Sequence, residues 1–315
     1  MRAVRFHEYG GPEVLREDDL ERPEPGAGQV RIRVAGTTFN AVDGNIRAGF
    51  MQEPIPVQLP HVPGLDVAGT VDALGDGVDG IAVGDRVVGF LPFVDDGAAA
   101  EFVLASAEIL ASAPTTIPLA DAAALPVVGL TAWQALFELA DLQAGQRILI
   151  NGAGGAVGGY AVQLASAAGA HVIATAGPNS RARVEAAGAD EIIDHTTTDV
   201  IDAVTQPVDI LLNLASIDPD RFAALAALVG DGGVVVNTTV WMPAPSDADR
   251  GVRGIDEYVR SDATQLAELV ARVDRGELTV DVAERMALSE LADVHTRAAQ
   301  GTISGKIVIV VDASE

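Results

Sequence analysis

The chain has 315 residues, 49% of them hydrophobic, and its 45 acidic against 20 basic side chains give a net charge of −25 at pH 7. This length suggests two domains with ample buried cores. The negative charge argues against nucleic acid or an anionic membrane as a partner, because both need a basic face. The absence of cysteine excludes disulfides, thiolate metal sites and cysteine nucleophiles.

Nothing in the sequence predicts a membrane or export segment. No run approaches the roughly 18 uncharged apolar residues of a membrane span. Residues 1–6 go directly into strand-like alternation, without the apolar core of a signal peptide. We therefore expect a soluble cytoplasmic protein.

Residues 1 to about 120 are rich in short strands punctuated by glycine. Residues 29–34 alternate as a half-buried strand does, and 37–50 form a polar segment able to become a helix. Residues 60–71 read as a turn leading into a strand, and 83–88 begin another. Many short strands with closely spaced turns indicate a small barrel.

From about residue 119 the sequence becomes helical and alanine-rich, and it leads into a βαβ unit over residues 146–175. The apolar run 147–150 predicts a buried parallel strand, and 171–175 predicts a second one. Between them lie a glycine turn and a helix with apolar residues on one face. The unit has the length that a right-handed crossover needs.

The glycine turn predicts a dinucleotide site, because a backbone without Cβ atoms lets a pyrophosphate approach main-chain N–H groups at a helix N-terminus. The strict G-x-G-x-x-G spacing is not met, and a tight structural loop is the alternative. A preceding strand, a following helix and the βαβ setting favour the dinucleotide. The residues expected at the cofactor are Gly152, Ala153, Gly154, Gly155, Ala156, Val157 and Gly158.

The segment after the second strand favours NADP(H) over NAD. An NAD site usually has Asp or Glu about 20 residues on, holding the ribose 2′-hydroxyl. Here Thr175, Ala176 and Gly177 lead to Arg181, with no acid before Glu185. An arginine would bind the 2′-phosphate that a carboxylate would repel. The alternative is that Arg181 and Arg183 both belong to the solvated face of the next helix.

Helix and strand patterns continue to alternate after residue 175. Helices are expected at 181–187, near 200 and at 222–229, with strands at 191–193, 208–212 and 233–236. This order predicts an α/β fold with a parallel, doubly wound sheet. A helix follows at 263–275. No crossover follows the last strand, at 305–311, so we expect this strand to return to the first domain.

The chain resembles the medium-chain dehydrogenase/reductase superfamily, and within it the zinc-free NADPH:quinone oxidoreductase (zeta-crystallin-like) branch. The matching segments follow the family's order over nearly the whole chain: 40–49, 63–69, 83–87, 124–136, the glycine turn with 161–165, 188–194 and 305–308. The resemblance implies a GroES-like β-barrel catalytic domain from both chain ends (1–120 and 259–315). It also implies a Rossmann NADP-binding domain inserted at 121–258, and a homodimer or homotetramer.

Two departures from the larger superfamily indicate that no catalytic zinc is bound. Zinc alcohol dehydrogenases have Gly-His-Glu where this chain has Gly64-Leu65-Asp66, and leucine cannot ligate a metal. Their cysteine ligands are missing as well. The histidines are scattered without paired ligand spacing; they are His7, His61, His171, His195 and His295.

The absence of a catalytic zinc limits the classes of substrate that can accept a hydride. Hydride exchange with a plain alcohol passes through an alkoxide and needs a Lewis acid or proton relay. Hydride addition to a quinone gives a phenol-like oxyanion with a pKa of about 10, and an enone gives a delocalised enolate. We therefore expect hydride transfer from NADPH to a quinone or other activated enone.

Three other functions stay open. Enoyl-thioester reductases of this branch carry a tyrosine proton donor where this chain has Phe50, which argues against that reaction. A non-catalytic NADPH-binding protein would bind the cofactor and turn over no acceptor. A zinc-type alcohol dehydrogenase would contain stoichiometric metal.

The resemblance also implies roles for single residues. Asn40 and Asp43 would line the cleft and orient the substrate and nicotinamide, although both could simply cap a helix. Thr131 would touch the nicotinamide, or be an N-cap before 132–139. His195 stands where relatives stack a tyrosine on adenine, and a solvated loop histidine is the alternative.

Further positions follow from the predicted strands and loops. Asn213 and Asn237 end parallel strands, where ligands of open α/β sheets bind, and turn-capping is the alternative. The loops 48–59 and 241–253, with Phe50 and Trp241, are expected to line the substrate pocket.

Overall fold

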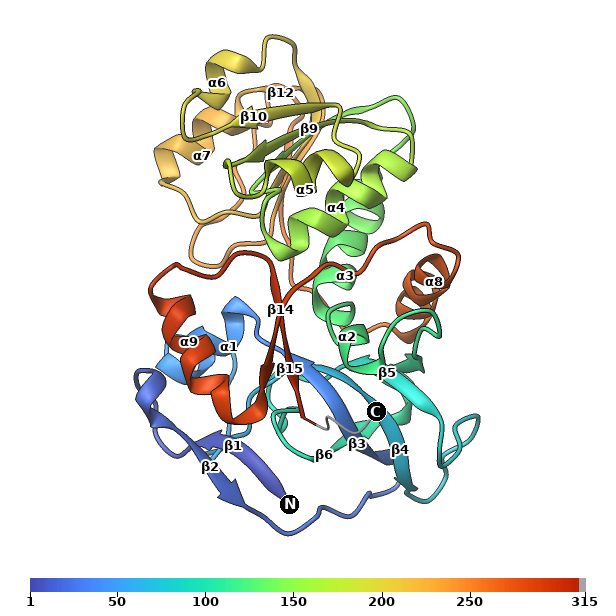
Figure 1. Cartoon of the computed structure of the whole chain (residues 1–315). Helices are drawn as coiled ribbons and strands as arrows, with labels where there is room; N and C mark the ends of the chain where they lie inside the picture. Colours follow the sequence, from blue (N-terminus) through green and yellow to red (C-terminus); the bar gives the residue numbers. More distant parts are fainter. Residues whose placement is uncertain (312–315) are drawn as a thin grey trace. The chain divides into compact units, whose positions relative to one another are not determined.

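Two β-sheets organise the computed structural model, which describes residues 1–311 (Figure 1). The larger sheet belongs to unit 1, formed by Met1–Val127 and the chain from Ser261 on, and the other belongs to unit 2, Val128–Arg260. Unit 2 is therefore inserted between the two parts of unit 1.

The unit 1 sheet has seven strands in the order β14-β15-β3-β4-β5-β7, with β6 also paired to β3. The long β3 follows the predicted alternation and pairs antiparallel with β4, β6 and β15. The return of the last strand to the first part of the chain is thereby confirmed. The strands are β3 (Gln29–Thr38), β4 (Asp66–Leu74), β5 (Arg86–Phe90), β6 (Phe102–Ser106), β7 (Leu110–Ser112), β14 (Val282–Ala287) and β15 (Lys306–Val310).

A separate antiparallel pair, β1 (Arg2–Phe6) with β2 (Leu15–Asp19), precedes this sheet. The polar segment after β3 forms α1 (Ala41–Ala48), which packs beside α9 (Leu291–Ala299) (Figure 1). The amphipathic α8 (Ala263–Asp274) lies next to β7. Short helical turns complete unit 1: η1 (Pro12–Val14), η2 (Ala107–Ile109), α2 (Leu119–Ala122) and η4 (Leu288–Glu290).

Unit 2 contains a six-stranded, all-parallel sheet in the order β10-β9-β8-β11-β12-β13. Numbered along the chain from β8, this is the 3-2-1-4-5-6 order of dinucleotide-binding sheets, so the predicted doubly wound fold is confirmed. The strands are β8 (Arg147–Asn151), β9 (His171–Ala176), β10 (Glu191–Asp194), β11 (Val208–Asn213), β12 (Val229–Asn237) and β13 (Arg253–Asp256).

The crossover helices of unit 2 occupy the predicted positions within a few residues. α4 (Ala156–Ala167) packs against β8 and β9, α5 (Arg181–Ala186) contacts β9 and β10, and α7 (Pro219–Ala226) contacts β12. α6 (Val200–Ala203) is a single turn. The helix expected at 222–229 starts earlier, because Asp218 caps it and Pro219 follows. It ends before Val229, where β12 begins.

The alanine-rich segment forms the helical run Leu119–Leu139, including α3 (Pro126–Trp133) and the wider turn η3 (Gln134–Leu139). By length and composition alone this run is apolar enough to cross a membrane, with a mean hydropathy of 1.4, which differs from the sequence expectation. Within the fold, 78% of its most apolar window is buried, as in a core helix.

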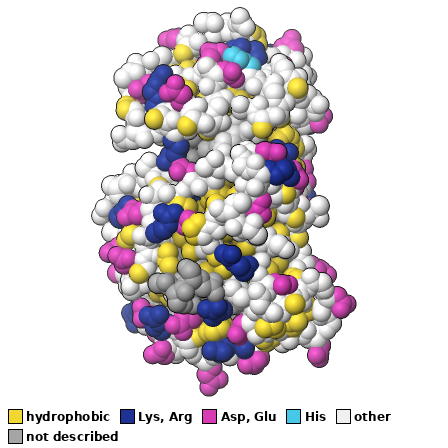
Figure 2. All heavy atoms as spheres, turned by 45° about the vertical axis from the view of Figure 1, so that its right-hand side comes forward, with side chains coloured by type: hydrophobic (Ala, Val, Ile, Leu, Met, Phe, Trp, Pro, Cys, Tyr) yellow, Lys and Arg dark blue, Asp and Glu magenta, His cyan; other side chains and the backbone are white. Residues whose placement is uncertain are grey.

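Acidic and basic side chains are interspersed on the face shown in Figure 2. Many arginines contact carboxylates directly. Arg221 pairs with Asp199 at 2.7 Å, and Arg297 pairs with Glu284 at 2.6 Å. The few positive charges are therefore largely matched by neighbouring acids.

Two adjacent glycines of α4 provide a matched test of how closely this helix packs. A Cβ on Gly158 would lie 2.5 Å from main-chain atoms of Ala153, whereas a Cβ on Gly159 would meet nothing within 4 Å. We expect Gly158→Ala to lower the free energy of unfolding by about 1–3 kcal/mol. Gly159→Ala should raise it by up to about 1 kcal/mol through helix propensity. Urea titrations of both variants measure this, and equal effects would contradict the close approach.

Candidate functional site

Polar side chains form a continuous hydrogen-bonded ladder along the carboxyl edge of the unit 2 sheet. Asn151, Asn213, Asn237 and Asp256 end β8, β11, β12 and β13 and are paired in register. The Asn151 amide donates to Asn213 Oδ1 at 2.8 Å, and the Asn213 amide donates to Asn237 Oδ1 at 2.9 Å. The Asn237 amide in turn donates to Asp256 Oδ1 at 3.1 Å. These side chains satisfy one another at the edge where α/β sheets bind ligands.

The ladder also fixes the loops that follow the strands. Asn213 donates to the carbonyl of Ala215, and Asn237 donates to the carbonyls of Thr239 and Met242 at 2.9 and 2.7 Å. The turn-capping role that the sequence left open for both asparagines is therefore present. Contact of either amide with a cofactor remains a prediction.

Thr175 connects the ladder to the glycine turn. Its hydroxyl donates to Asn151 Oδ1 at 3.1 Å and accepts a hydrogen bond from the Gly152 main chain at 2.8 Å. Gly152 has a φ of +89°, which favours glycine. The buried Thr175 thus shapes the turn from β9, and Ala176 beside it is buried as well.

The turn is a cradle of main-chain atoms. A Cβ on Gly154 would lie 2.3 Å from Ser180 Oγ, so the neighbouring loop leaves no room for a side chain there. Gly155 is the N-cap of α4, and the N–H groups of Ala156, Val157 and Gly158 begin the helix. The buried Ala153 lies beneath Gly158. This arrangement fits the pyrophosphate of a dinucleotide.

Two arginines of α5 take different positions. Arg181 is exposed, with Nη1 3.5 Å from the Ile192 carbonyl. Arg183 instead donates from Nη2 to the Gly154 carbonyl at 2.6 Å and so braces the turn. Residues two apart on a helix point about 200° apart, so only one of them can reach the turn. Arg181 was the residue predicted at the cofactor, and the contact of Arg183 with the glycine turn was not predicted from the sequence.

His195 is exposed and lies close to Gly177, where a Cβ would be 3.6 Å from its Nε2. The structure therefore brings these two predicted residues together. The neighbouring Asp194 accepts hydrogen bonds from Thr196, which, together with His195 and Arg181, hold the pKa of that carboxyl below its usual value.

Thr131 lies well inside α3 and is buried. Because this helix already begins at Pro126, the alternative of an N-cap before 132–139 is wrong. The two residues expected at the substrate pocket are both exposed. Phe50 follows the left-handed Gly49 at the end of α1 and is 66% exposed, and Trp241 is 70% exposed with a φ of +77°.

In unit 1, Asn40 belongs to a buried ionic network centred on Asp66. Lys306 Nζ lies 3.1 Å from Asp66 Oδ2 and donates to Asn40 Oδ1 at 2.5 Å. The Asn40 amide donates to the same Asp66 oxygen at 2.9 Å, and Thr38 donates to it as well. The other carboxylate oxygen accepts from the Val127 main chain at 2.7 Å. Both ends of the Asn40 amide are thus held in place.

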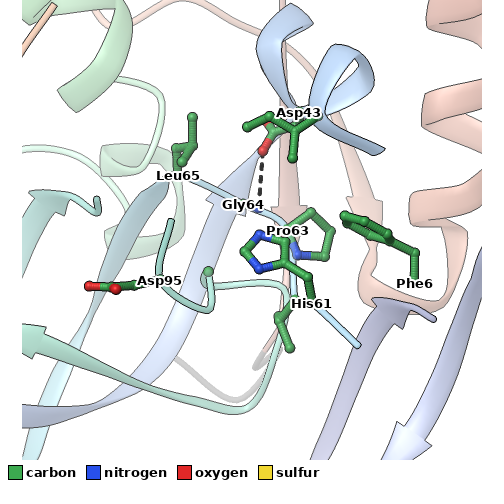
Figure 3. Close-up of a pocket in the computed structure, with 10 residues that line it drawn as sticks. Phe6, Asp43, His61, Pro63, Gly64, Leu65 and Asp95 are labelled. Atoms are coloured by element: carbon green, nitrogen blue, oxygen red, sulfur yellow. Dashed lines mark hydrogen bonds between the residues drawn. The ribbon is translucent and has the colours of Figure 1, made fainter. Parts of the chain in front are cut away.

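Asp43 has a different role from Asn40. Its carboxylate accepts hydrogen bonds from the main chains of Asn40 at 2.8 Å and Gly64 at 3.1 Å, so it caps α1 and fastens the turn before β4 (Figure 3). Burial raises the pKa of Asp43 to about 6, against the lowering effect of these two bonds. Helix capping, left open by the sequence for both residues, holds for Asn40, the N-cap of α1, and for Asp43, its partner in the capping box.

A small hollow beside Asp43 is lined by Phe6, Ile46, His61 and Leu65 (Figure 3). His61 is buried against the Phe6 ring, with 5.4 Å between ring centroids, and burial lowers its pKa. Residues 1–311 contain no group of three His, Cys, Asp or Glu side chains that could hold a metal ion.

Several buried ionisable residues were not among the predicted site residues, and two of them, Lys306 and Glu257, are of particular interest. Lys306 is the chain's one lysine, a signal that the sequence analysis did not use, and it is 2% exposed. Glu257, directly after β13, is 9% exposed, and no pattern around it predicted its burial.

Comparisons with known proteins agree with this architecture. Residues 26–115 match the alcohol dehydrogenase GroES-like domain, and 187–309 match a zinc-binding dehydrogenase domain. A chloroplast envelope quinone oxidoreductase homolog of Arabidopsis thaliana is 32% identical, over 98% of both chains. The structure of the quinone oxidoreductase from Coxiella burnetii has a TM-score of 0.91 and 29% identity, over 99% of both chains. An NAD-dependent alcohol dehydrogenase structure has a TM-score of 0.90 and 30% identity, over 99% of this chain and 100% of that one.

The fold and these matches define an oxidoreductase that uses a nicotinamide cofactor. The chain belongs to the medium-chain dehydrogenase/reductase superfamily, among the quinone oxidoreductases. The predicted superfamily and fold are thereby confirmed.

Breaking the buried pair tests its contribution to unit 1. Lys306→Met leaves Asp66 charged and buried without its cation, so we expect the free energy of unfolding to fall by about 3–5 kcal/mol. Asp66→Asn combined with Lys306→Met removes both charges and should recover part of this loss. Urea denaturation of the single and double variants measures it. An equal loss in both would show that the charge pairing is not the cause.

Proposed function

We propose that this protein is an NADPH-dependent, zinc-independent reductase of quinones or other activated enones. The observation that carries the choice of cofactor is the segment after β9, where Arg181 opens α5 and no acidic residue precedes Glu185. A 2′-phosphate would be bound there by the exposed guanidinium, whereas an NAD site uses a carboxylate at this place. The names of the quinone oxidoreductase relatives support the acceptor class.

The two units would have different roles in this reaction. NADPH, when bound, supplies the hydride. In unit 2 the main-chain cradle from Gly152 to Gly158 would bind the pyrophosphate, and the amide ladder would keep the loops around it in place. Unit 1 would be the catalytic part. There Asn40 and Asp43 would orient the acceptor rather than transfer protons, since both Asp43 oxygens already accept main-chain hydrogen bonds.

The proposed independence from zinc rests on residue chemistry. Leu65 stands where zinc alcohol dehydrogenases place a histidine ligand, and the chain has no cysteine. The reduced quinone is a phenol-like oxyanion, which a few hydrogen bonds can stabilise without a Lewis acid. Phe50, which offers no hydroxyl, favours such an acceptor over an enoyl thioester.

We further propose that the protein works in the cytoplasm as a homodimer or homotetramer, on a small molecule, with neither nucleic acid nor a membrane as partner. The family resemblance supports the assembly. The net charge of −25 and the pairing of surface arginines with acids support the absence of a polyanionic partner.

The direct test is the initial rate of NADPH oxidation with a simple benzoquinone or naphthoquinone, with NADH in parallel. We expect rapid oxidation, a preference for NADPH and no loss of rate after treatment with a chelator. Loss of activity with the chelator would contradict zinc independence. Cofactor binding without turnover of quinones would favour the enoyl-thioester or non-catalytic alternatives, which a crotonyl thioester assay separates.

Arg181→Ala tests the 2′-phosphate contact. We expect the dissociation constant for NADPH to rise roughly tenfold, because one charge-assisted contact is lost, while that for NADH changes little. Fluorescence titration measures both constants. Arg221→Ala, which removes another arginine of unit 2 from its pair with Asp199, is the control and should leave both unchanged. Equal weakening of NADPH and NADH by Arg181→Ala would rule out the contact.

A further inference from the structure

Glu257 is a buried carboxyl whose oxygen atoms have no hydrogen-bond partner. It follows directly after β13, and its main chain donates to the Asn237 carbonyl at 2.8 Å, so it stands beside the end of the amide ladder. The residue is 9% exposed, and both Oε1 and Oε2 lack a partner within residues 1–311. Buried polar atoms are nearly always paired, so such a group calls for a specific explanation.

The surroundings of Glu257 favour the neutral, protonated form of its carboxyl group. Burial, and secondly the nearby carboxylate of Glu138, raise the pKa of Glu257 to about 9. Glu138 itself is paired with Arg260 through two contacts of 2.7 and 2.8 Å, so that arginine is already engaged by another acid. Near neutral pH, Glu257 therefore offers one O–H donor and one carbonyl acceptor side by side.

The sheet topology determines which part of a dinucleotide would lie near Glu257. Strands β9 and β10 lie on one side of β8, and β11, β12 and β13 lie on the other. A dinucleotide crosses such a sheet at the switch point between β8 and β11, with one nucleotide over each half. Arg181 and Gly177, at the β9 side, belong to the half with the adenosine 2′-phosphate under the proposed function. The other half, which includes Glu257, is left for the nicotinamide nucleotide.

We propose that Glu257 binds the nicotinamide carboxamide of the cofactor through a pair of hydrogen bonds. A primary carboxamide has a carbonyl acceptor and an N–H donor on neighbouring atoms, which complement the neutral carboxyl group. The Glu257 O–H donates to the carboxamide oxygen, and the carboxamide N–H donates to the Glu257 carbonyl oxygen. Binding would thus satisfy both orphaned atoms at once. This inference rests on the proposed nicotinamide cofactor and adds the residue that orients its reactive ring.

The test compares two ligands that differ only in the nicotinamide: NADPH and 2′-phospho-ADP-ribose. Glu257→Leu removes both polar atoms at similar size, and we expect it to raise the dissociation constant for NADPH roughly tenfold to hundredfold. The constant for 2′-phospho-ADP-ribose should stay within about twofold, since that ligand makes no use of the carboxyl. Isothermal titration calorimetry measures both without any turnover.

Glu257→Gln is the conservative control, because an amide side chain can also donate one hydrogen bond and accept another. It should retain most of the affinity for NADPH. In the wild type, the ratio of the NADPH constant to the 2′-phospho-ADP-ribose constant should rise as the pH passes about 9, because the ionised carboxyl loses its donor. The Glu257→Gln ratio should not change over that range.

Different results would overturn different parts of the inference. If Glu257→Leu raises the dissociation constants for both ligands equally, or changes neither, the carboxamide contact is overturned and the proposed function is left intact. A wild-type protein that binds neither ligand would overturn the proposed function and this contact together.

Discussion

The ion pair between Lys306 and Asp66 is the interaction on which the architecture of unit 1 depends. It joins the first residue of β15 to the first residue of β4, and between these strands lies β3, which pairs with both. Burying two charges costs more than an apolar contact of the same size, unless each charge finds partners. Here Asp66 has donors on both oxygens and Lys306 also holds Asn40. The pair thereby specifies how the last strand docks and, through the same atoms, how the Asn40 amide is oriented.

In unit 2, the buried polar side chains are paired mainly through neutral amide groups. Its polar edge is built from amides and one carboxylate that hydrogen-bond across neighbouring strands, so the ends of the strands and the loops after them are fixed together. Glu257 lies next to this satisfied ladder and is the exception, because both of its oxygens lack a partner among the described residues. The contrast between a fully paired edge and one orphaned carboxyl is what singles out Glu257 as a binding group.

Periodicity was sufficient to predict most of the fold. The apolar runs of β8 and β9 and the glycine turn between them follow from local sequence, and the resemblance identified the superfamily. The short β13 was missed, because its sequence Arg-Gly-Ile-Asp has no alternating pattern. Side-chain partners across long sequence distances were also missed. Lys306 meets Asn40 over 266 positions, and nothing local to either residue indicates the contact. Arg183 reaches the glycine turn because of its helical phase, which a list of basic residues does not reveal.

The insertion of unit 2 between the two parts of unit 1 has a consequence for biosynthesis. Residues 128–260 are contiguous, so unit 2 can complete its sheet as soon as they have left the ribosome. The first part of unit 1 emerges earlier but must wait, because β14 and β15 are translated only after all of unit 2. Until then Asp66 has no cation, and one edge of β3 lacks its neighbour. We therefore expect nascent chains to pass through a stage in which the sheet of unit 2 is complete while that of unit 1 still lacks two strands, the stage at which a chaperone would be of most use.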